Sequence, residues 1–148
     1  MAVKPIPEGY HAVQPYLIVN GAKGLLEFVK TVFGASQSEL IQAPDGDRVM
    51  HAEVKIGDST IMMADAQGPW QPMAAAMYVY VPNVDETYKK ALAAGGTSVM
   101  EPADQFYGDR HGGVKDQWGN FWWIATRVEN VSNEEMQRRA KEHMAKQA

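Results

Sequence analysis

Two short stretches of the chain place a histidine and an acidic residue two positions apart. His51 and Glu53 form one pair, and Asp109 and His111 form the other. Side chains two residues apart point to the same face of a β-strand, so each pair would present an imidazole nitrogen beside a carboxylate. With a third donor, such a pair can hold a divalent ion, and without one it can act as a general base. The simpler alternative is a hydrogen-bonded histidine on a half-exposed sheet face.

The composition excludes several other kinds of chemistry. The 148 residues carry 14 Lys and Arg against 18 Asp and Glu, a formal net charge of −4, and no cysteine. Disulfides, zinc–thiolate sites and a cysteine nucleophile are therefore excluded, and the basic surface that nucleic acids need is missing. No apolar run approaches the roughly 20 residues of a membrane helix, and the N-terminal stretch does not resemble a signal peptide. We expect a cytoplasmic protein that binds neither nucleic acid nor membranes.

The hydrophobic pattern predicts the same order of elements twice. Each half begins with a β-branched and aromatic strand, "PYLIV" or "MYVYV", and continues with apolar residues at helical spacing. Gly34 ends the first helix, and Asn83 with Glu86 indicates the start of the second. Three further strands are expected in each half, at residues 36–42, 48–56 and 59–65, and at residues 97–102, 110–117 and 121–127.

An ungapped shift of 62 residues superposes the two halves, and it places the Gly-Asp-Arg triplet of residues 46–48 on that of residues 108–110. We therefore predict a duplicated β-α-β-β-β unit in a single α+β domain of residues 1–148. The capping motif "SNEE" opens a final helix. The expected parts are a first module at 10–66, a linker at 67–75, a second module at 76–128 and a C-terminal helix at 132–146.

Four stretches carry a family resemblance: "PYLIVNGAKGLLEFVKTVFGA", "MHAEVKIGDSTIMMAD", "DQFYGDRHGGVKDQWGNFWWIAT" and "VSNEEMQRRA". Together with the duplicated unit, about residues 10–130 resemble the vicinal oxygen chelate superfamily of glyoxalases, bleomycin-resistance proteins and extradiol dioxygenases. The stretches are most similar to its PhnB-like glyoxalase subgroup. The resemblance implies a curved, cup-shaped mixed sheet around a small-molecule cleft, and a homodimer. It does not give the reaction, because this fold serves unrelated chemistries.

The resemblance also bears on metal binding. The metalloenzymes of the superfamily take four ligands, usually His, Glu or Gln, from the first and last strands of each unit. The corresponding positions here are Gln14, Ala76, Ile61 and Trp123, of which only Gln14 has a donor atom. We therefore expect no metal at these positions and no other cofactor. The alternative is a divalent metal ion held by rearranged ligands, Gln14 with His51 and Glu53.

Strand alternation predicts which residues face the cleft. The expected ligand-binding residues are mostly aromatic or apolar, as in small-molecule pockets: Gln14, Tyr16, Ile61, Met63, Tyr78, Tyr80, Phe121 and Trp123. The opposite face is expected to pack under the helices and carries Leu17, Val19, Met62, Met77, Val79, Val81, Trp122 and Ile124. The alternative is that the aromatic residues pack on one another or across a dimer interface and bind nothing.

The loop "QFYGDR" adds Tyr107 and Arg110 to the candidate ligand-binding residues. A guanidinium group binds a carboxylate or phosphate through two parallel hydrogen bonds, so Arg110 could recognise an anionic group at the mouth of the cleft. The alternative is that Arg110 pairs with a neighbouring carboxylate and only holds the loop.

Three functions are compatible with these residues. We favour a metal-free protein that binds a small, partly aromatic or apolar ligand, since the chain shows no catalytic triad, P-loop or dinucleotide-binding motif. The second is a metal-dependent lyase, isomerase or dioxygenase with rearranged ligands. The third is a metal-free enzyme that uses His51 or Glu53 as a general base. The sequence assigns no catalytic residue, and whether the protein is an enzyme stays open.

Overall fold

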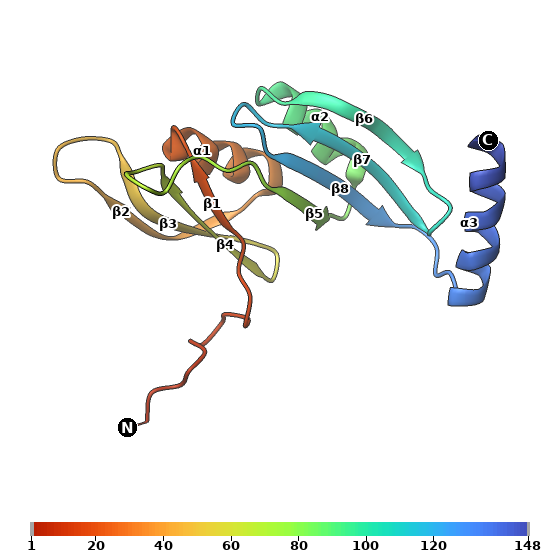
Figure 1. Cartoon of the computed structure of the whole chain (residues 1–148), viewed down its shortest axis with the longest axis horizontal. Coiled ribbons are helices and arrows are strands. Elements are labelled where there is room, and N and C mark those ends of the chain that lie inside the picture. The colour runs from red at the N-terminus through yellow and green to blue at the C-terminus, as the bar shows by residue number, and fades with distance from the viewer. Residues whose placement is uncertain (1, 148) are drawn as a thin grey trace. The chain divides into compact units, whose positions relative to one another are not determined.

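The structure, a computed structural model, describes residues 2–147. The chain divides into two compact units, Met1–Ala75 and Ala76–Ala148, and each contains one four-stranded sheet. Figure 1 shows the order of helices and strands along the chain. The predicted α+β architecture with a duplicated β-α-β-β-β unit and a C-terminal helix is confirmed.

The first unit places its helix on one face of a mixed sheet. The sheet order is β1-β4-β3-β2, with β1 parallel to β4 and the other pairs antiparallel. The helix begins after β1 and buries an apolar stripe that includes Leu25, Leu26 and Val29. The elements are β1 (Tyr16–Val19), α1 (Ala22–Phe33), β2 (Ser36–Gln42), β3 (Val49–Ile56) and β4 (Ser59–Asp65).

The second unit repeats this plan and adds a helix. Its sheet order is β5-β8-β7-β6, again with one parallel pair, β5 with β8. Trp122 and Ile124 of β8 are 0% exposed and lie at the centre of its core. The elements are β5 (Ala76–Tyr80), α2 (Val84–Ala93), β6 (Thr97–Asp104), β7 (Asp109–Lys115), β8 (Phe121–Arg127) and α3 (Asn133–Gln147).

The predicted helix signals act as expected. Gly34 follows α1 with a left-handed φ of 64°, a conformation that a residue with a Cβ rarely adopts. The Asn83 side chain accepts a hydrogen bond from the Glu86 backbone N–H at 3.2 Å, which satisfies a donor at the first turn of α2. Along residues 2–147, no helix combines the length and apolar character needed to cross a membrane.

The two units differ in the loop before their last strand. In the first unit, Ile56 pairs with Ser59, so only two residues form the turn. In the second, Lys115 pairs with Phe121, which leaves a five-residue loop. The buried Asp116 carboxylate organises this loop, because it accepts hydrogen bonds from the Asn120 backbone at 2.9 Å and from Trp122 Nε1 at 2.8 Å. Because the loops differ in length, the numbering offset between equivalent residues of the two units changes from the third strand to the fourth.

The segment after β4 stays with the first sheet. The Met73 backbone N–H donates to the Ile18 carbonyl at 3.1 Å, so this segment forms a short antiparallel bridge at the edge of β1. A second bridge joins Gln67 and Trp70 and closes a tight loop between them. The predicted linker therefore packs along the edge of the first sheet, and its two bridges hold the loop that carries Trp70 in place.

Candidate functional site

The first sheet has one face covered by α1 and one face that we call the first open face. Leu17, Met63 and Ala52 are at most 1% exposed and occupy adjacent paired positions on the covered face. Partners in neighbouring strands share a face, and side chains alternate along each strand. The next row therefore lies on the first open face, and it consists of Tyr16, Met62, Glu53 and Glu39.

Ile61 and Met63, two of the predicted cleft residues, are on the covered face. Their side chains are 4% and 0% exposed, and Met62 takes the place expected for Ile61 on the first open face. The face prediction for these two residues, and for Met62, was wrong. The physical reason is register: β1 pairs Tyr16 with Met62, and a one-residue shift exchanges the two faces of a strand.

The structure brings His51 and Glu53 together in a hydrogen-bonded chain. His51 Nε2 lies 2.8 Å from Glu53 Oε2, and Tyr16 Oη lies 3.2 Å from His51 Nδ1. The Tyr10 hydroxyl donates to the second carboxylate oxygen, Glu53 Oε1. Glu53 is 5% exposed, and this burial acts to raise the pKa of its carboxyl. The hydrogen bonds from Tyr10 and His51 outweigh burial and hold that pKa below its usual range.

Glu39 of β2 joins this pair. Ligand atoms of Glu39, His51 and Glu53 all lie within 4.8 Å of one another. Gln14, the donor predicted to complete the set, instead accepts a hydrogen bond from the His11 backbone N–H at 2.8 Å. Glu39 could not be found from the sequence, because its position opposite Glu53 depends on a β2–β3 register that is interrupted by irregular pairs.

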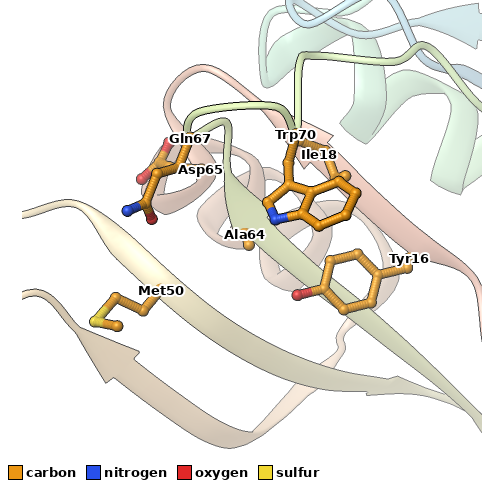
Figure 2. Close-up of a pocket in the computed structure, with 7 residues that line it drawn as sticks. All are labelled: Tyr16, Ile18, Met50, Ala64, Asp65, Gln67 and Trp70. Atoms are coloured by element: carbon orange, nitrogen blue, oxygen red, sulfur yellow. The ribbon is translucent and has the colours of Figure 1, made fainter.

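A pocket of about 400 Å³ lies in the first unit, beside this chain of hydrogen bonds. In Figure 2 the Trp70 indole and the Tyr16 ring form its aromatic side. Trp70 is 67% exposed, and it lies in the predicted linker, where no functional residue was expected. The pocket is lined by Tyr16, Ile18, Met50, Ala64, Asp65, Gln67 and Trp70.

The carboxylate in this pocket is already engaged. Asp65 Oδ1 accepts hydrogen bonds from the backbone N–H groups of Gly21 and Ala22 at 2.7 and 2.8 Å, at the start of α1. Asp65 Oδ2 accepts from the Val49 backbone N–H at 2.7 Å. The Asp65 carboxylate therefore holds the start of α1 and the start of β3 in place. Other polar groups at the pocket include the Gln67 amide, the Tyr16 hydroxyl and the Trp70 indole N–H.

The second sheet has an open face of different chemistry, which we call the second open face. The row that corresponds to Tyr16, Met62, Glu53 and Glu39 consists of Tyr78, Trp123, Gly113 and Met100. A Cβ added at Gly113 would come within 2.4 Å of Trp123 Cε3, so the indole lies directly against the glycine backbone. An aromatic ring therefore fills the place that the Glu53 side chain has in the first unit.

Asp109, the acidic member of the second predicted pair, is a buried acceptor on the second open face. Its exposure is 2%, and its Oδ2 accepts hydrogen bonds from the Tyr78 and Tyr80 hydroxyls at 2.7 and 2.8 Å. Arg127 donates to Oδ1 at 3.1 Å. Burial opposes ionisation of this carboxyl, but the three donors hold the pKa of Asp109 below its usual range. Burial and the bond to Asp109 raise the pKa of Tyr78.

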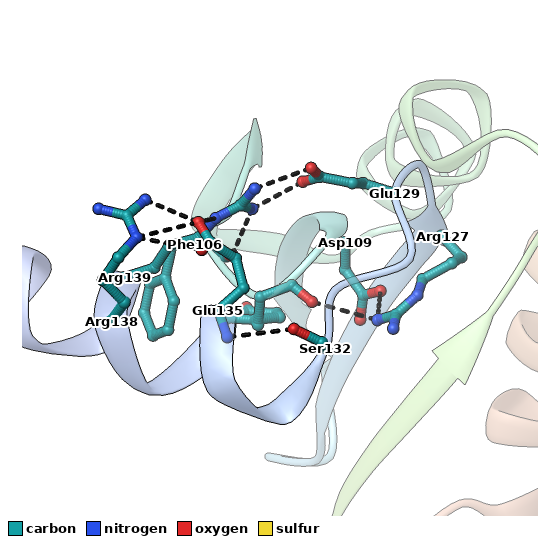
Figure 3. A network of polar contacts seen from close by, with 9 residues as sticks. Phe106, Asp109, Arg127, Glu129, Ser132, Glu135, Arg138 and Arg139 are labelled. Carbon is teal, nitrogen blue, oxygen red and sulfur yellow. Dashed lines mark hydrogen bonds and ion pairs between the residues drawn. The ribbon is translucent and has the colours of Figure 1, made fainter.

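Arg127 stands at the edge of a polar network that attaches α3 to the second sheet (Figure 3). None of the α3 residues is buried, so polar contacts hold this helix. Arg139 donates to both oxygens of Glu129 at 2.7 and 2.8 Å and to the Phe106 carbonyl at 3.0 Å. Hydrogen bonds from Arg138 and Arg139 lower the pKa of Glu135 to about 2. The predicted cap is present, because the Glu135 backbone N–H donates to Ser132 Oγ.

His111 lies among aromatic rings on the second open face. Its Nδ1 is 2.5 Å from the Tyr107 hydroxyl, and its ring centroid is 4.9 Å from that of Tyr78 and 5.3 Å from that of Trp123. His111 is 9% exposed, and burial lowers its pKa. The Nε2 atom is buried and has no hydrogen-bond partner among the described residues. Phe121 adds a further ring, 5.8 Å from Trp123.

Arg110 does not lie on the second open face. It alternates with Asp109 and His111 along β7, and its guanidinium binds Asp85 of α2 through two hydrogen bonds at 2.9 and 3.0 Å. Asp104 accepts a third at 3.3 Å. The prediction of Arg110 as a ligand-binding residue of the open face is contradicted, because its side chain lies off that face and three of its five N–H donors bind these carboxylates. The alternative of a structural ion pair is confirmed.

The register also changes which residues of the two units correspond. Ala52 pairs with Met63, which pairs with Leu17, and Gly112 pairs with Ile124, which pairs with Val79. Ala52 and Gly112 are therefore equivalent, and so are the histidines that precede them, His51 and His111. Between β3 and β7 the shift is 60 residues and not 62, so the two Gly-Asp-Arg triplets do not occupy equivalent places.

The repeated strand order of the two sheets agrees with comparisons to known proteins. Residues 10–124 match the family model of the Glyoxalase/Bleomycin resistance protein/Dioxygenase superfamily, and the chain belongs to that superfamily. It is 30% identical over 137 residues to the uncharacterized protein Mb0911c of Mycobacterium bovis, a match that spans 85% of this chain and 90% of that protein.

Solved structures show the same fold. TioX from Micromonospora sp. ML1 is similar with a TM-score of 0.66 and 22% identity, over 79% of this chain and 100% of that one. A PhnB protein from Bacillus cereus is similar with a TM-score of 0.63 and 15% identity, over 78% of this chain and 99% of that one.

The residues at the superfamily's metal-ligand positions do not fit a metal ion. With the observed register these positions hold Gln14, Met62, Ala76 and Trp123, and only Gln14 carries an oxygen donor. A methyl group and an indole cannot ligate a divalent ion, and a thioether suits soft metals only. No reaction step is therefore assigned to a metal at these positions.

Proposed function

We propose that the protein binds a small, partly aromatic or apolar molecule, without a metal at the superfamily's ligand positions. The observation that carries this proposal is the pocket of about 400 Å³ in the first unit. Its size falls in the range of roughly 300–1,000 Å³ typical of small-molecule sites. Trp70 and Tyr16 offer ring surfaces, and Gln67 offers an amide that can orient a polar group of the ligand.

The second open face supports the same proposal. Its aromatic residues surround His111, whose Nε2 leaves a hydrogen-bonding position unused among the described residues. Leaving such an atom unpaired costs about 1–3 kcal/mol, which a polar group of a ligand would recover. Tyr78, Tyr80, Tyr107, Phe121 and Trp123 stay predicted ligand-binding residues on this basis, and Gln14 stays a prediction for the first unit.

Ligand-observed NMR with a panel of mono- and bicyclic aromatic compounds tests the proposal. We expect several compounds to bind the wild-type protein, and Trp70→Ala to weaken them by roughly threefold to tenfold, the contribution of one aromatic contact. Trp70→Phe should retain part of the affinity. Met144→Ala removes an apolar side chain that is 71% exposed in α3 and should change nothing. The proposal would be contradicted if no compound of the panel bound the wild-type protein. It would also be contradicted if the compounds bound Trp70→Ala and Tyr16→Ala with unchanged affinity.

A metal-dependent lyase, isomerase or dioxygenase is the second candidate function. The group formed by Glu39, His51 and Glu53 favours it over a metal-free enzyme, because it brings nitrogen and oxygen donors together. Isomerase and dioxygenase assays with and without added divalent ions would test it. Turnover that is lost on chelation and restored by one ion is the expected result for this candidate.

We also propose that the protein is a PhnB-like member of the superfamily and a cytoplasmic homodimer. The similarity to the PhnB protein from Bacillus cereus supports the subgroup, at 15% identity. Native mass spectrometry tests the oligomeric state directly. A dimer at micromolar concentration is the expected outcome, and a monomer over the whole accessible range would rule the dimer out.

A further inference from the structure

We propose that Glu39, His51 and Glu53 form a binding site for a divalent first-row transition-metal ion on the first open face. The site uses none of the superfamily's ligand positions, and it does not depend on the ligand-binding function proposed above. Its donors are one imidazole nitrogen and the oxygens of two carboxylates. Mixed nitrogen and oxygen donors suit Zn²⁺, Mn²⁺, Fe²⁺ or Co²⁺, whereas Mg²⁺ and Ca²⁺ prefer oxygen alone.

The charges around this group support a cation. Glu39 and Glu53 are direct partners across β2 and β3, and like charges placed opposite each other destabilise a sheet. Along residues 2–147, no Lys or Arg forms an ion pair with either carboxylate, and the His51–Glu53 contact is their one salt bridge. A divalent ion between the two carboxylates would remove the repulsion and would supply the charge that the protein itself does not.

The second unit shows that the fold does not need these residues. The positions equivalent to Glu39 and Glu53 are Met100 and Gly113, and the sheet pairs there in the same way. Only the histidine recurs, as His111, and it has no carboxylate beside its Nε2. The carboxylates are therefore additions to the first unit, placed where each can reach His51.

The hydrogen bonds of the metal-free site show which of them must change when a metal ion binds. An ionised carboxylate only accepts, so His51 Nε2 donates to Glu53, and with a neutral imidazole the Tyr16 hydroxyl donates to His51 Nδ1. A metal ion on Nε2 needs the lone pair there, so the imidazole proton moves to Nδ1 and is donated to the Tyr16 oxygen. Tyr16 is then a positioning residue for His51, and Tyr10 holds the second oxygen of Glu53.

Calorimetric titration of chelator-treated full-length protein with Zn²⁺ tests the site. We expect one Zn²⁺ per chain and no response to Mg²⁺. Glu39→Gln, His51→Ala and Glu53→Gln should each weaken Zn²⁺ binding by at least about tenfold, and Tyr16→Phe should weaken it by a smaller factor. His111→Ala is the matched control, because it removes the equivalent histidine of the second unit and should leave the affinity unchanged.

A second readout uses Co²⁺, whose visible absorption reports its ligands. We expect the spectrum of the Co²⁺-loaded protein to change in His51→Ala and to stay the same in His111→Ala. Wild-type protein that binds no Zn²⁺ would overturn the proposal. Binding that is equal in all variants would also overturn it, and would indicate an adventitious ion on an exposed residue such as His143.

Two features keep these tests decisive. Glu39 lies on β2, whose residues are all exposed, so Glu39→Gln should fold normally even if Glu53→Gln does not. Circular dichroism of each variant checks this. The titration contains no organic ligand, so its failure leaves the small-molecule proposal standing, and failure of the aromatic panel leaves the metal site standing.

Discussion

His51 and His111 occupy the same place in two sheets of the same design, but their surroundings are opposite. His51 is linked at both ring nitrogens, to Tyr16 and Glu53. His111 is linked only through Nδ1, to Tyr107, and its Nε2 is buried among rings without a partner in the described chain. The difference arises from one position in the neighbouring row, which holds Glu53 in the first unit and Gly113 in the second.

The covered faces of the two sheets differ much less. Ala52, Met63 and Leu17 form a row on the covered face of the first unit, and Gly112, Ile124 and Val79 form the equivalent row of the second. Packing under a helix restricts these positions to apolar residues of matching volume. No such restriction acts on the open faces. The comparison therefore indicates that the fold is specified on one face of each sheet and that chemistry diverges on the other.

The largest effect is expected when the glutamate of the first unit, Glu53, is introduced at the equivalent position of the second unit, Gly113. Gly113→Glu should lower the free energy of unfolding by about 3 kcal/mol, because the Trp123 ring fills the space that the new side chain needs. Adding Trp123→Met should recover about 0.5–3 kcal/mol, since the two changes share one site. Urea denaturation measures both.

Gly46→Glu is the control for this pair of variants. Gly46 is exposed, and a Cβ there meets nothing within 4 Å, so the change should stay within about 0.5 kcal/mol of wild type. Equal stability of Gly113→Glu and Gly46→Glu would show that Trp123 does not exclude a side chain from that position.

The buried histidine gives a smaller effect that depends on pH. The pKa of His111 is lowered in the folded protein, whereas the unfolded chain titrates near 6.5. Below about pH 6.5 the unfolded state therefore binds a proton that folded His111 does not, and stability falls by up to about 1.4 kcal/mol per pH unit. His111→Gln should flatten this dependence between about pH 7 and 5.

Denaturation curves collected at several pH values separate this effect from that of Asp109. The pKa of Asp109 is lowered, so its contribution is present above the unfolded value near 3.9 and is lost only in a more acidic range. A His111→Gln curve that still follows the wild-type slope would show that His111 is not held neutral by burial.

The smallest effect compares the two arginines of the repeated triplet. Arg110→Ala should lower the thermal denaturation midpoint slightly, because it removes the contacts to Asp85 and Asp104. Arg48→Ala should leave the midpoint unchanged, since its side chain forms no ion pair within residues 2–147. Equal shifts would mean that the ion pairs of Arg110 add nothing, as is common for exposed pairs.

The order of elements could be predicted from the sequence because each signal is local. Gly34 ends α1, Asn83 caps α2, and alternating or helical apolar spacing identifies what lies between. The superfamily followed from these units together with the quoted stretches. Such features depend on residues a few positions apart, whose interactions do not require knowledge of the partner strand.

The faces of the strands were harder to predict because they depend on register. A two-residue turn at Gly57 and a five-residue loop after Lys115 shift the halves relative to each other, so an ungapped alignment placed Ile61 on the wrong face. Glu39 and Trp70 were missed for a related reason. Each gains its position from a non-local contact, the β2–β3 pairing for Glu39 and the bridge to β1 for the loop that carries Trp70.

The exposed position of Trp70 has an optical consequence. Of the 4 tryptophans in the sequence, Trp70 alone belongs to the first unit, and Trp118, Trp122 and Trp123 belong to the second. An indole that is 67% exposed emits at longer wavelength than a buried one and is open to collisional quenchers, whereas Trp122 is 0% exposed. Iodide should therefore quench Trp70 more strongly than the partly exposed Trp118 and Trp123 and the buried Trp122, and the quenched fraction would report mainly on the pocket of the first unit.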